Sequence, residues 1–280
     1  MRTVSMTASP SSIVIPQDII DSIIHELPAD SKAVLKRCCL VSHAFLQPSQ
    51  RKLFSTVTLT TEWQCSHLHS ALTSNPDFPS YIRALTVVEA ALTTVRLVPI
   101  LRKLLKLEKL QSLSIILSSF YAQYPFTTKM QPLLDFCKLP CLVSLTIKQA
   151  NAIPFIHLRE CRQLKHLALV ACSSTTNDDA EAQLSSSMLS NMSVSTTAYL
   201  DSLRIWDSAP RLRSMIDALG CPWCLSRLRK LSITDRNEND AQDITEILKA
   251  VARTLQTFEW FACPIWSMCS QQCLGRLSPL

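Results

Sequence analysis

Glycine is almost absent from this chain of 280 residues, because only Gly220 and Gly275 occur. The Gly-x-Gly-x-x-Gly loop and the P-loop both need several closely spaced glycines, since backbone N–H groups must approach the phosphates of a nucleotide. The chain contains neither motif. This excludes nucleotide-binding enzymes of these two types.

Long apolar runs and a dense set of cysteines are missing too. The apolar stretch at 13–15 is shorter than the ~7–15 residues of a signal-peptide core, and no segment reaches the ~20 residues that span a bilayer. The 12 cysteines are well below the ~8–10% of disulfide scaffolds. We expect an intracellular protein in a reducing compartment, cytoplasmic or nuclear, with no membrane partner and mostly buried thiols.

The charge balance is modest, at 28 Lys and Arg against 22 Asp and Glu, a formal net charge of +6. Nucleic-acid binders concentrate their bases on one face with aromatic residues that stack on bases, whereas the bases here are spread along the chain. We therefore expect a solvated surface and no nucleic-acid partner. With 47% hydrophobic and 18% charged residues, the chain is expected to fold.

A six-residue pattern, apolar-x-x-apolar-x-apolar, is repeated through the chain. The copies lie at 82–87, 110–115, 142–147, 164–169, 200–205, 228–233 and 255–260. They begin 22 to 36 residues apart, around or beyond the ~20–29 residues of leucine-rich repeats. The last three positions alternate apolar, polar, apolar, which predicts a short strand with one buried face.

Helices are predicted in two of the segments that connect these strands. Val95 to Leu110 and Ala241 to Leu255 both place leucine, isoleucine or valine at helical spacing. One strand–helix unit cannot cover its own apolar face, so neighbouring units must stack. We predict an α/β fold in which an irregular leucine-rich-repeat solenoid, with parallel strands backed by helices, covers 55–263.

The repeats are irregular in two respects. The full leucine-rich pattern has Asn or Cys three residues after the third apolar position, and only Cys172 and Cys263 comply. The other copies carry Ala90, Ser118, Ala150, Ser208 and Arg236 there. In addition, 12 of the 25 residues at 173–197 are Ser or Thr, which predicts a mobile inserted loop.

The first sixty residues have a different organisation. Pro16 suits a first helical turn, and isoleucines and leucine follow at helical spacing up to Pro28. Further helices are predicted at 33–40, capped by Asp30 or Ser31, and at about 42–53, bent near Pro48. A core this small is marginal by itself. The unit either packs on the first repeat or is completed by a partner.

The residues of this segment resemble an F-box. Ile15 to Leu27 is similar to its opening Leu-Pro-x-Glu-Leu run, and Leu35 to Phe45 is similar to its second half, where Val-Ser-x-x-Trp is usual. Ile15, Asp18 and Phe45 replace the usual Leu, Glu and Trp. The continuation up to Leu59 is similar to F-box-like proteins of mushroom-forming fungi, and the resemblance covers 13–59.

The resemblance implies an adaptor rather than an enzyme, with no cofactor. F-box proteins dock on the Skp subunit of Skp–cullin–F-box ubiquitin ligases and hold a substrate protein with a C-terminal domain. The residues that it implies for Skp binding are Ile15, Pro16, Ile19, Ile20, Ile23, Leu27, Cys39, Leu40, Val41 and Phe45. The alternative is a repeat scaffold for protein interactions with no ubiquitin-ligase role.

A target protein of unknown identity is expected on the concave face of the solenoid, which repeat proteins use for binding. The outward positions between and after the apolar ones form this face. The candidates there are Lys148, His166, Arg204, Trp206, Lys230, Glu259 and Phe261. Exposed aromatic side chains and Arg often anchor interfaces, although the inserted loop or the next turn could cover Trp206.

Three groups of cysteine and histidine have ligand-like spacing but unfavourable contexts. Cys221 and Cys224 match a redox Cys-x-x-Cys but lie in a return segment, not after a strand. A zinc site would pair them with Cys269 and Cys273 in the chain-terminal tail. Cys65, His67 and His69 fall on a predicted helix, where residues two apart face different directions. We predict no metal site.

The predicted organisation is a flexible N-terminus at 1–12, a helical module at 13–54, the solenoid at 55–263 and a tail at 264–280. Solenoids normally need a polar capping repeat, and the tail does not resemble one. We expect that the tail caps irregularly or that the sequence is a shortened form of a longer repeat protein, which the resemblance favours.

Overall fold

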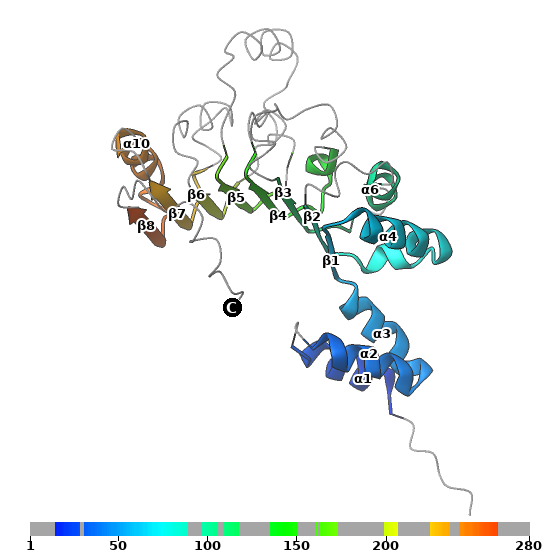
Figure 1. Ribbon diagram of the computed structural model, residues 1–280. Helices are drawn as coiled ribbons and strands as arrows, with labels where there is room; N and C mark the ends of the chain where they lie inside the picture. Colours follow the sequence, from blue (N-terminus) through cyan, green and yellow to red (C-terminus); the bar gives the residue numbers. More distant parts are fainter. Residues whose placement is uncertain are drawn as a thin grey trace, which may run out of the picture. The chain divides into compact units, whose positions relative to one another are not determined.

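The chain forms two compact units, Met1–Thr56 and Val57–Leu280, in a computed structural model (Figure 1). The structure describes residues 15–28, 31–88, 97–105, 109–117, 135–150, 161, 163–172, 199–206, 225–235 and 241–262. The predictions for 1–12, for the insertion at 173–197 and for the tail at 264–280 lie outside these ranges.

The first unit consists of the three helices that the sequence predicted. They are α1 (Gln17–Glu26), α2 (Lys32–Val41) and α3 (His43–Leu53). Pro16 occupies the N-cap of α1, and the chain is extended at Leu27, before Pro28. The helix α3 continues past Pro48.

The core of this unit is small. Ile20, Ile24 and Leu35 are buried in it, and the side chains that pack partly against them are Leu27, Cys38, Ala44, Phe45 and Leu53. Two side-chain hydrogen bonds join α1 to α3: the Gln17 Nε2 donates to the Ala44 carbonyl over 3.1 Å, and the Lys52 Nζ donates to the His25 carbonyl. The unit therefore depends on few contacts.

The second unit is built on a sheet of eight strands in chain order, and β2 to β8 all pair in parallel (Figure 1). The strands are β1 (Thr56–Leu59), β2 (Ala84–Val88), β3 (Ser112–Ile116), β4 (Ser144–Lys148), β5 (His166–Val170), β6 (Ser202–Trp206), β7 (Lys230–Asp235) and β8 (Thr257–Ala262). Each of the seven predicted strands is present, which confirms a solenoid-like α/β arrangement. The strand β1 was not predicted.

The apolar positions of the repeats align in two rows across the sheet. Leu113 in β3 pairs with Leu145 in β4, and Ile115 pairs with Ile147, and all four side chains are buried. The equivalent positions in β8 differ, because Phe258 is 38% exposed and Trp260 is 55% exposed. The expectation of a buried face is wrong there. Among the described residues β8 is the last strand, so its side chains have neighbours on one side only.

Helices pack on the apolar face of this sheet. They are α4 (Glu62–Ser74), α6 (Leu97–Leu105) and α10 (Ala241–Val251), with 3-10 helices η1 (Phe78–Tyr81) and η4 (Asp135–Lys138). Each α-helix buries an apolar stripe, such as Leu97, Ile100 and Leu104 in α6. No helix in the described ranges has the length and apolar character to cross a membrane.

Two of these helices are shorter than predicted. The residues before β3, from position 109, are no longer helical, and α10 gives way to a turn after Val251. Leu110 and Leu255 continue the helical spacing of apolar residues, but each is also the first apolar position of a strand pattern. The backbone must leave the helix before these positions to enter the sheet.

Candidate partner-binding surfaces

The helix α1 carries apolar side chains on two of its faces. Ile20 and Ile24, each 2% exposed, point into the core of the first unit. Ile19 and Ile23, one turn apart, are 48% and 46% exposed. One stripe is sufficient to pack a helix of this length against α2 and α3, so the second stripe is left on the surface.

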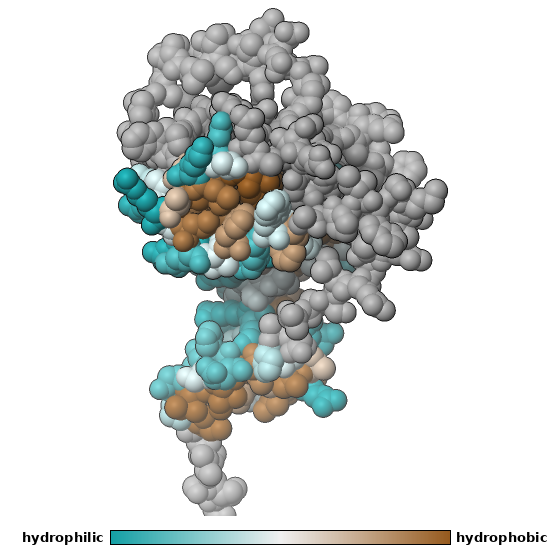
Figure 2. Space-filling view, turned by 90° about the vertical axis from the view of Figure 1, so that its left-hand side faces the viewer, coloured by the Kyte–Doolittle hydropathy of each residue, from teal (hydrophilic) through white to brown (hydrophobic). Residues whose placement is uncertain are grey.

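Further apolar side chains are exposed around α1 and on α2. Ile15 precedes α1 and is exposed, and Val34 is exposed in the first turn of α2 beside the buried Leu35. Leu40 and Val41 end α2, and Leu40 is 87% exposed. Figure 2 shows apolar atoms gathered over the helices of this unit. We refer to Ile15, Ile19, Ile23, Val34, Leu40 and Val41 as the apolar helical surface.

The residues that the F-box resemblance implied for Skp binding fall into three classes of exposure. Five lie on the apolar helical surface, and Pro16 is exposed next to it. Leu27, Cys39 and Phe45 are half-buried, and Phe45 packs against the core. Ile20 belongs to the core and not to the surface, contrary to expectation, because helix packing allows only one stripe of α1 to face inward. Partial burial, with the neighbouring Cys38 thiol, raises the pKa of Cys39.

Val34 was missed by the sequence reasoning. It is exposed on α2 although its neighbour Leu35 is 1% exposed. A second apolar residue beside the core residue of a short helix was the available signal.

The second unit presents the alternate strand positions on the opposite side of its sheet from the buried rows. We call this side the polar face, and it contains all seven predicted target-binding residues. Along β2 to β5 its positions are mostly Ser, Thr, Ala and aliphatic residues, such as Ser114, Thr146 and Ala168. Charged and aromatic residues concentrate along β6 to β8.

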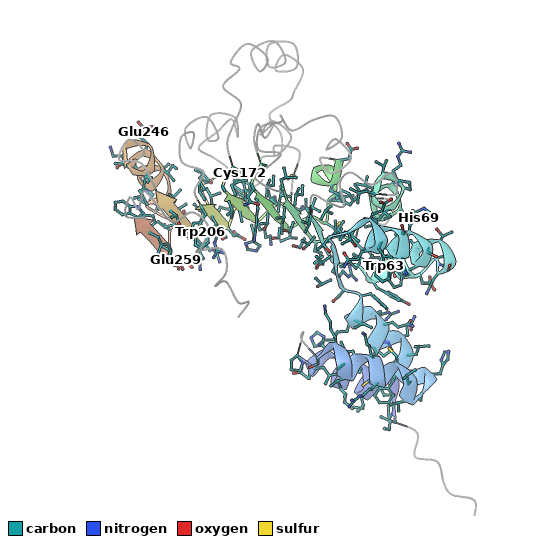
Figure 3. The ribbon with its side chains drawn as sticks, in the orientation of Figure 1. Trp63, His69, Cys172, Trp206, Glu246 and Glu259 are labelled. Atoms are coloured by element: carbon teal, nitrogen blue, oxygen red, sulfur yellow. The ribbon has the colours of Figure 1, made fainter. Side chains whose placement is uncertain are left out.

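The side chains at the β6–β8 end of the polar face interact with one another. The Lys230 Nζ lies 3.1 Å from the Glu259 Oε1. The Arg204 guanidinium carbon lies 5.9 Å from the centroid of the Trp206 ring, within cation–π range. Ser232, between Arg204 and Glu259 in the register, is buried. Figure 3 labels Trp206 and Glu259 at this end of the sheet.

The electrostatic environment of Glu259 favours its ionised form. A hydrogen bond from Lys230 is the main cause of the lowered pKa of Glu259, and the charge of Lys230, a hydrogen bond to Ser232 and the charge of Arg204 lower it further. Two cations therefore surround one carboxylate at this point. Lys148 and Trp206 are half-buried, whereas His166, Arg204 and Phe261 are exposed.

A second contact between a cation and a ring lies near the start of the strands. The Arg227 guanidinium carbon is 4.4 Å from the centroid of the Tyr199 ring, and Tyr199 is exposed. Sequence reasoning did not single out this pair, because its two residues are separated by a full repeat.

Cys172 has the structural role that its place in the repeat predicted. Its thiol donates to the Ile147 carbonyl in the preceding repeat over 3.3 Å. Burial raises the pKa of Cys172. Ala150, at the equivalent position one repeat earlier, is buried and offers no such donor. Cys263, the other predicted linking residue, lies outside the described ranges.

The cysteine and histidine groups were also located where the structure describes them. On α4, Cys65 is buried while His67 is exposed and stacks on Trp63 with a centroid separation of 3.7 Å. His69 is half-buried, and Figure 3 labels it with Trp63. Within the described ranges no three His, Cys, Asp or Glu side chains could hold a metal ion. Residues 221, 224, 269 and 273 fall outside those ranges.

Comparison with known proteins adds no assignment to these surfaces. No protein-family model matches the chain, and neither does any curated protein. The apolar helical surface and the polar face are therefore the features from which a function can be argued.

Proposed function

We propose that this protein is a non-catalytic adaptor. Its first unit docks on the Skp subunit of a Skp–cullin–F-box ubiquitin ligase, and its second unit, a leucine-rich-repeat solenoid, presents a target protein. The observation that carries the proposal is the exposed second stripe of α1, with Ile19 and Ile23, in a segment that resembles an F-box.

The energetics of the apolar helical surface support docking on a partner protein. Contiguous exposed apolar patches on folded proteins commonly mark interaction sites. Covering these side chains with a partner removes them from water, at roughly 25 cal/mol per Å² of apolar surface. Leu40, at 87% exposure, would contribute the largest change among them.

The arrangement of the first unit supports a partner that contacts α1 and α2 together. Val34 in α2 and Ile19 in α1 extend the surface over two helices, while Gln17 and Lys52 hold α1 against α3 through hydrogen bonds. The contact surface is thus built on helices with fixed positions within the unit. Binding there requires no nucleophile and no cofactor.

A scaffold with no ubiquitin-ligase role is the competing proposal. The charged and aromatic polar face of the second unit would serve a scaffold equally well, since it does not involve the helical unit. Only Skp binding separates the two functions.

The test is co-purification of the full chain with Skp, followed by a titration of the complex. The double variant Ile19→Asp/Ile23→Asp introduces two charges into the apolar helical surface without touching the core. We expect it to weaken Skp binding at least about tenfold, since desolvating unpaired charges at an interface is costly. Ile20→Asp is unsuitable, because Ile20 is a core residue and the change would unfold the unit.

The matched control is Trp63→Asp, which places a charge at an exposed apolar site of the second unit. It should leave Skp binding unchanged. Circular dichroism must show the same helix content in all three proteins. If the folded wild-type chain does not bind Skp, the adaptor proposal is wrong and the scaffold remains.

A further inference from the structure

The polar face of the second unit has an excess of positive charge along β4 to β8. Lys148, Arg204 and Lys230 project from β4, β6 and β7, and His166 projects from β5. Among the outward positions of β2 to β8 within the described residues, Glu259 is the only acid. The chain as a whole has a much smaller relative excess, with 28 basic and 22 acidic residues.

One of these cations is held in place by an aromatic ring. The contact of Arg204 with Trp206, at 5.9 Å from the ring centroid, restricts the side chain while Arg204 remains exposed. A restricted guanidinium loses less conformational entropy on binding, and its planar donors match a carboxylate in a bidentate arrangement. Arg204 is therefore a prepared acceptor site for an acidic group.

Lys230 is already paired, and its partner is internal. Glu259 lies 3.1 Å from Lys230 and carries the only negative charge on these outward positions. Glu259 therefore competes with any external carboxylate for Lys230. The cluster of Arg204, Lys230 and Glu259 retains a net charge of one positive unit.

We propose that the polar face along β4 to β8 binds an acidic segment of a protein in extended conformation, with Arg204 as its principal contact. This inference rests on the proposed function, because it names the chemistry of the target that the adaptor presents. Small side chains between the cations, such as Ala168 and Ser202, allow a peptide backbone to approach the sheet.

The spacing of the cations indicates the spacing of the acidic residues. Neighbouring strands lie ~4.8 Å apart, so Lys148 on β4 and Arg204 on β6 are separated by roughly 10 Å across the sheet. Three residues of an extended peptide cover about the same length, at ~3.3 Å per residue. A segment with an acidic residue at every third position can therefore place successive carboxylates opposite Lys148 and Arg204.

A protein segment fits this surface better than a nucleic acid. Nucleic-acid affinity comes mainly from many Lys and Arg contacts to phosphates, and this face offers three full positive charges. Glu259 would repel a phosphate backbone that runs across β8. A peptide needs fewer charges because its backbone and apolar side chains also contribute, for example against the exposed Phe261.

The test uses three fluorescein-labelled peptides of twelve residues on the full chain, read by fluorescence anisotropy at low ionic strength. The probe repeats Glu-Ser-Ala, and the comparison peptides carry Gln or Lys in place of Glu. We expect the Glu peptide to bind at least about tenfold more tightly than the Gln peptide, a difference of ~1.4 kcal/mol. Equal binding of the two overturns the inference.

Two variants should move the affinity in opposite directions. Arg204→Glu should weaken binding of the Glu peptide at least about tenfold, because it replaces the principal contact by a repelling charge. Glu259→Gln removes the internal competitor while keeping the side-chain shape, and should tighten binding about threefold, the scale of an exposed ion pair. The inference is overturned if Glu259→Gln weakens binding.

The matched control for charge reversal is Arg102→Glu. Arg102 is exposed on α6, away from the polar face, so its reversal changes the net charge by the same amount. It should alter affinity less than about twofold, since exposed charges further apart than the Debye length of ~10 Å are largely screened. Equal effects of Arg102→Glu and Arg204→Glu mean that only net charge matters, which overturns the site.

Two further arms exclude other readings of a positive result. The double variant Lys148→Glu/Arg204→Glu should bind the Lys peptide instead of the Glu peptide. A single-stranded DNA of twelve nucleotides that binds more tightly than the Glu peptide, and loses binding in Arg204→Glu, assigns the face to nucleic acid and overturns the inference. Skp binding should be unchanged in Arg204→Glu, so failure here is distinguishable from failure of the adaptor proposal.

Discussion

At the scale of single residues, Cys172 shows how one side chain links neighbouring repeats. Its thiol contacts the carbonyls of Ile147 in the preceding repeat and of Val170 in its own strand. A buried carbonyl that loses its donor costs more than the bond itself contributes. The place of Cys172 in the repeat, rather than any reactivity of its thiol, accounts for a cysteine here.

We expect Cys172→Ala to lower the free energy of unfolding by about 1–2 kcal/mol, from the lost hydrogen bond and the lost sulfur contacts. Cys172→Ser keeps a donor and should lose less. Urea denaturation of the full chain, followed by circular dichroism, measures both. Wild-type stability in Cys172→Ala would show that the contact with Ile147 is dispensable.

The raised pKa of Cys172 adds a pH dependence of definite sign. Burial disfavours the thiolate in the folded state, so this contribution to stability is complete below the unfolded thiol pKa of about 8.5 and decreases as the pH rises above it. The wild-type chain should therefore lose more stability than Cys172→Ser between neutral and alkaline pH. The same urea titrations at the two pH values test this.

At the scale of elements, the strands were predictable because their signal is local. The alternation of apolar and polar residues and its recurrence predicted seven strands, and all seven are present. The same pattern also contains β1, with Phe54, Val57 and Leu59 in the apolar places. It was missed because Phe54 ends the preceding helix, and its pattern was assigned to that helix alone.

Other features of the elements depend on contacts that the sequence does not display. Whether Ile19 or Ile20 faces the core depends on how α1 packs against α2 and α3. The pairing of Lys230 with Glu259 depends on the register between repeats whose lengths range from 22 to 36 residues. The exposure of Trp260 depends on what lies beyond β8. These are tertiary properties, so the candidate surfaces could be predicted only as rows of positions.

The two faces of the sheet should differ sharply in their contribution to stability, and β3 offers a matched pair. Ile115 is buried at 1% exposure, whereas its neighbour Ile116 is half-buried on the polar face. We expect Ile115→Ala to destabilise the chain by about 3 kcal/mol, through lost burial and a residual cavity, and Ile116→Ala by less than about 1.5 kcal/mol. Equal losses in urea denaturation would contradict the register, since a slip by one residue exchanges the two faces.

At the scale of the whole molecule, the two units are stabilised to different extents. The first unit buries three apolar side chains fully, whereas the second aligns two buried rows across successive strands, each strand held by parallel pairing to its neighbours. Small helical units with so little core are close to the balance between burial and conformational entropy. A partner that covers the apolar helical surface would therefore stabilise the first unit more than the second.

Hydrogen exchange on the full chain measures this difference directly. Amides of α1 to α3 should exchange faster than those of β3 to β6, because local opening free energy follows the density of buried contacts. Addition of Skp should slow exchange in α1 and α2, where Ile19, Ile23 and Leu40 would be covered, and leave the strands unchanged. Equal protection of both units before Skp is added would contradict the marginal stability of the helical unit. Slowing confined to the strands would place the docking surface on the repeat unit, because a bound partner raises the opening free energy of the elements it contacts.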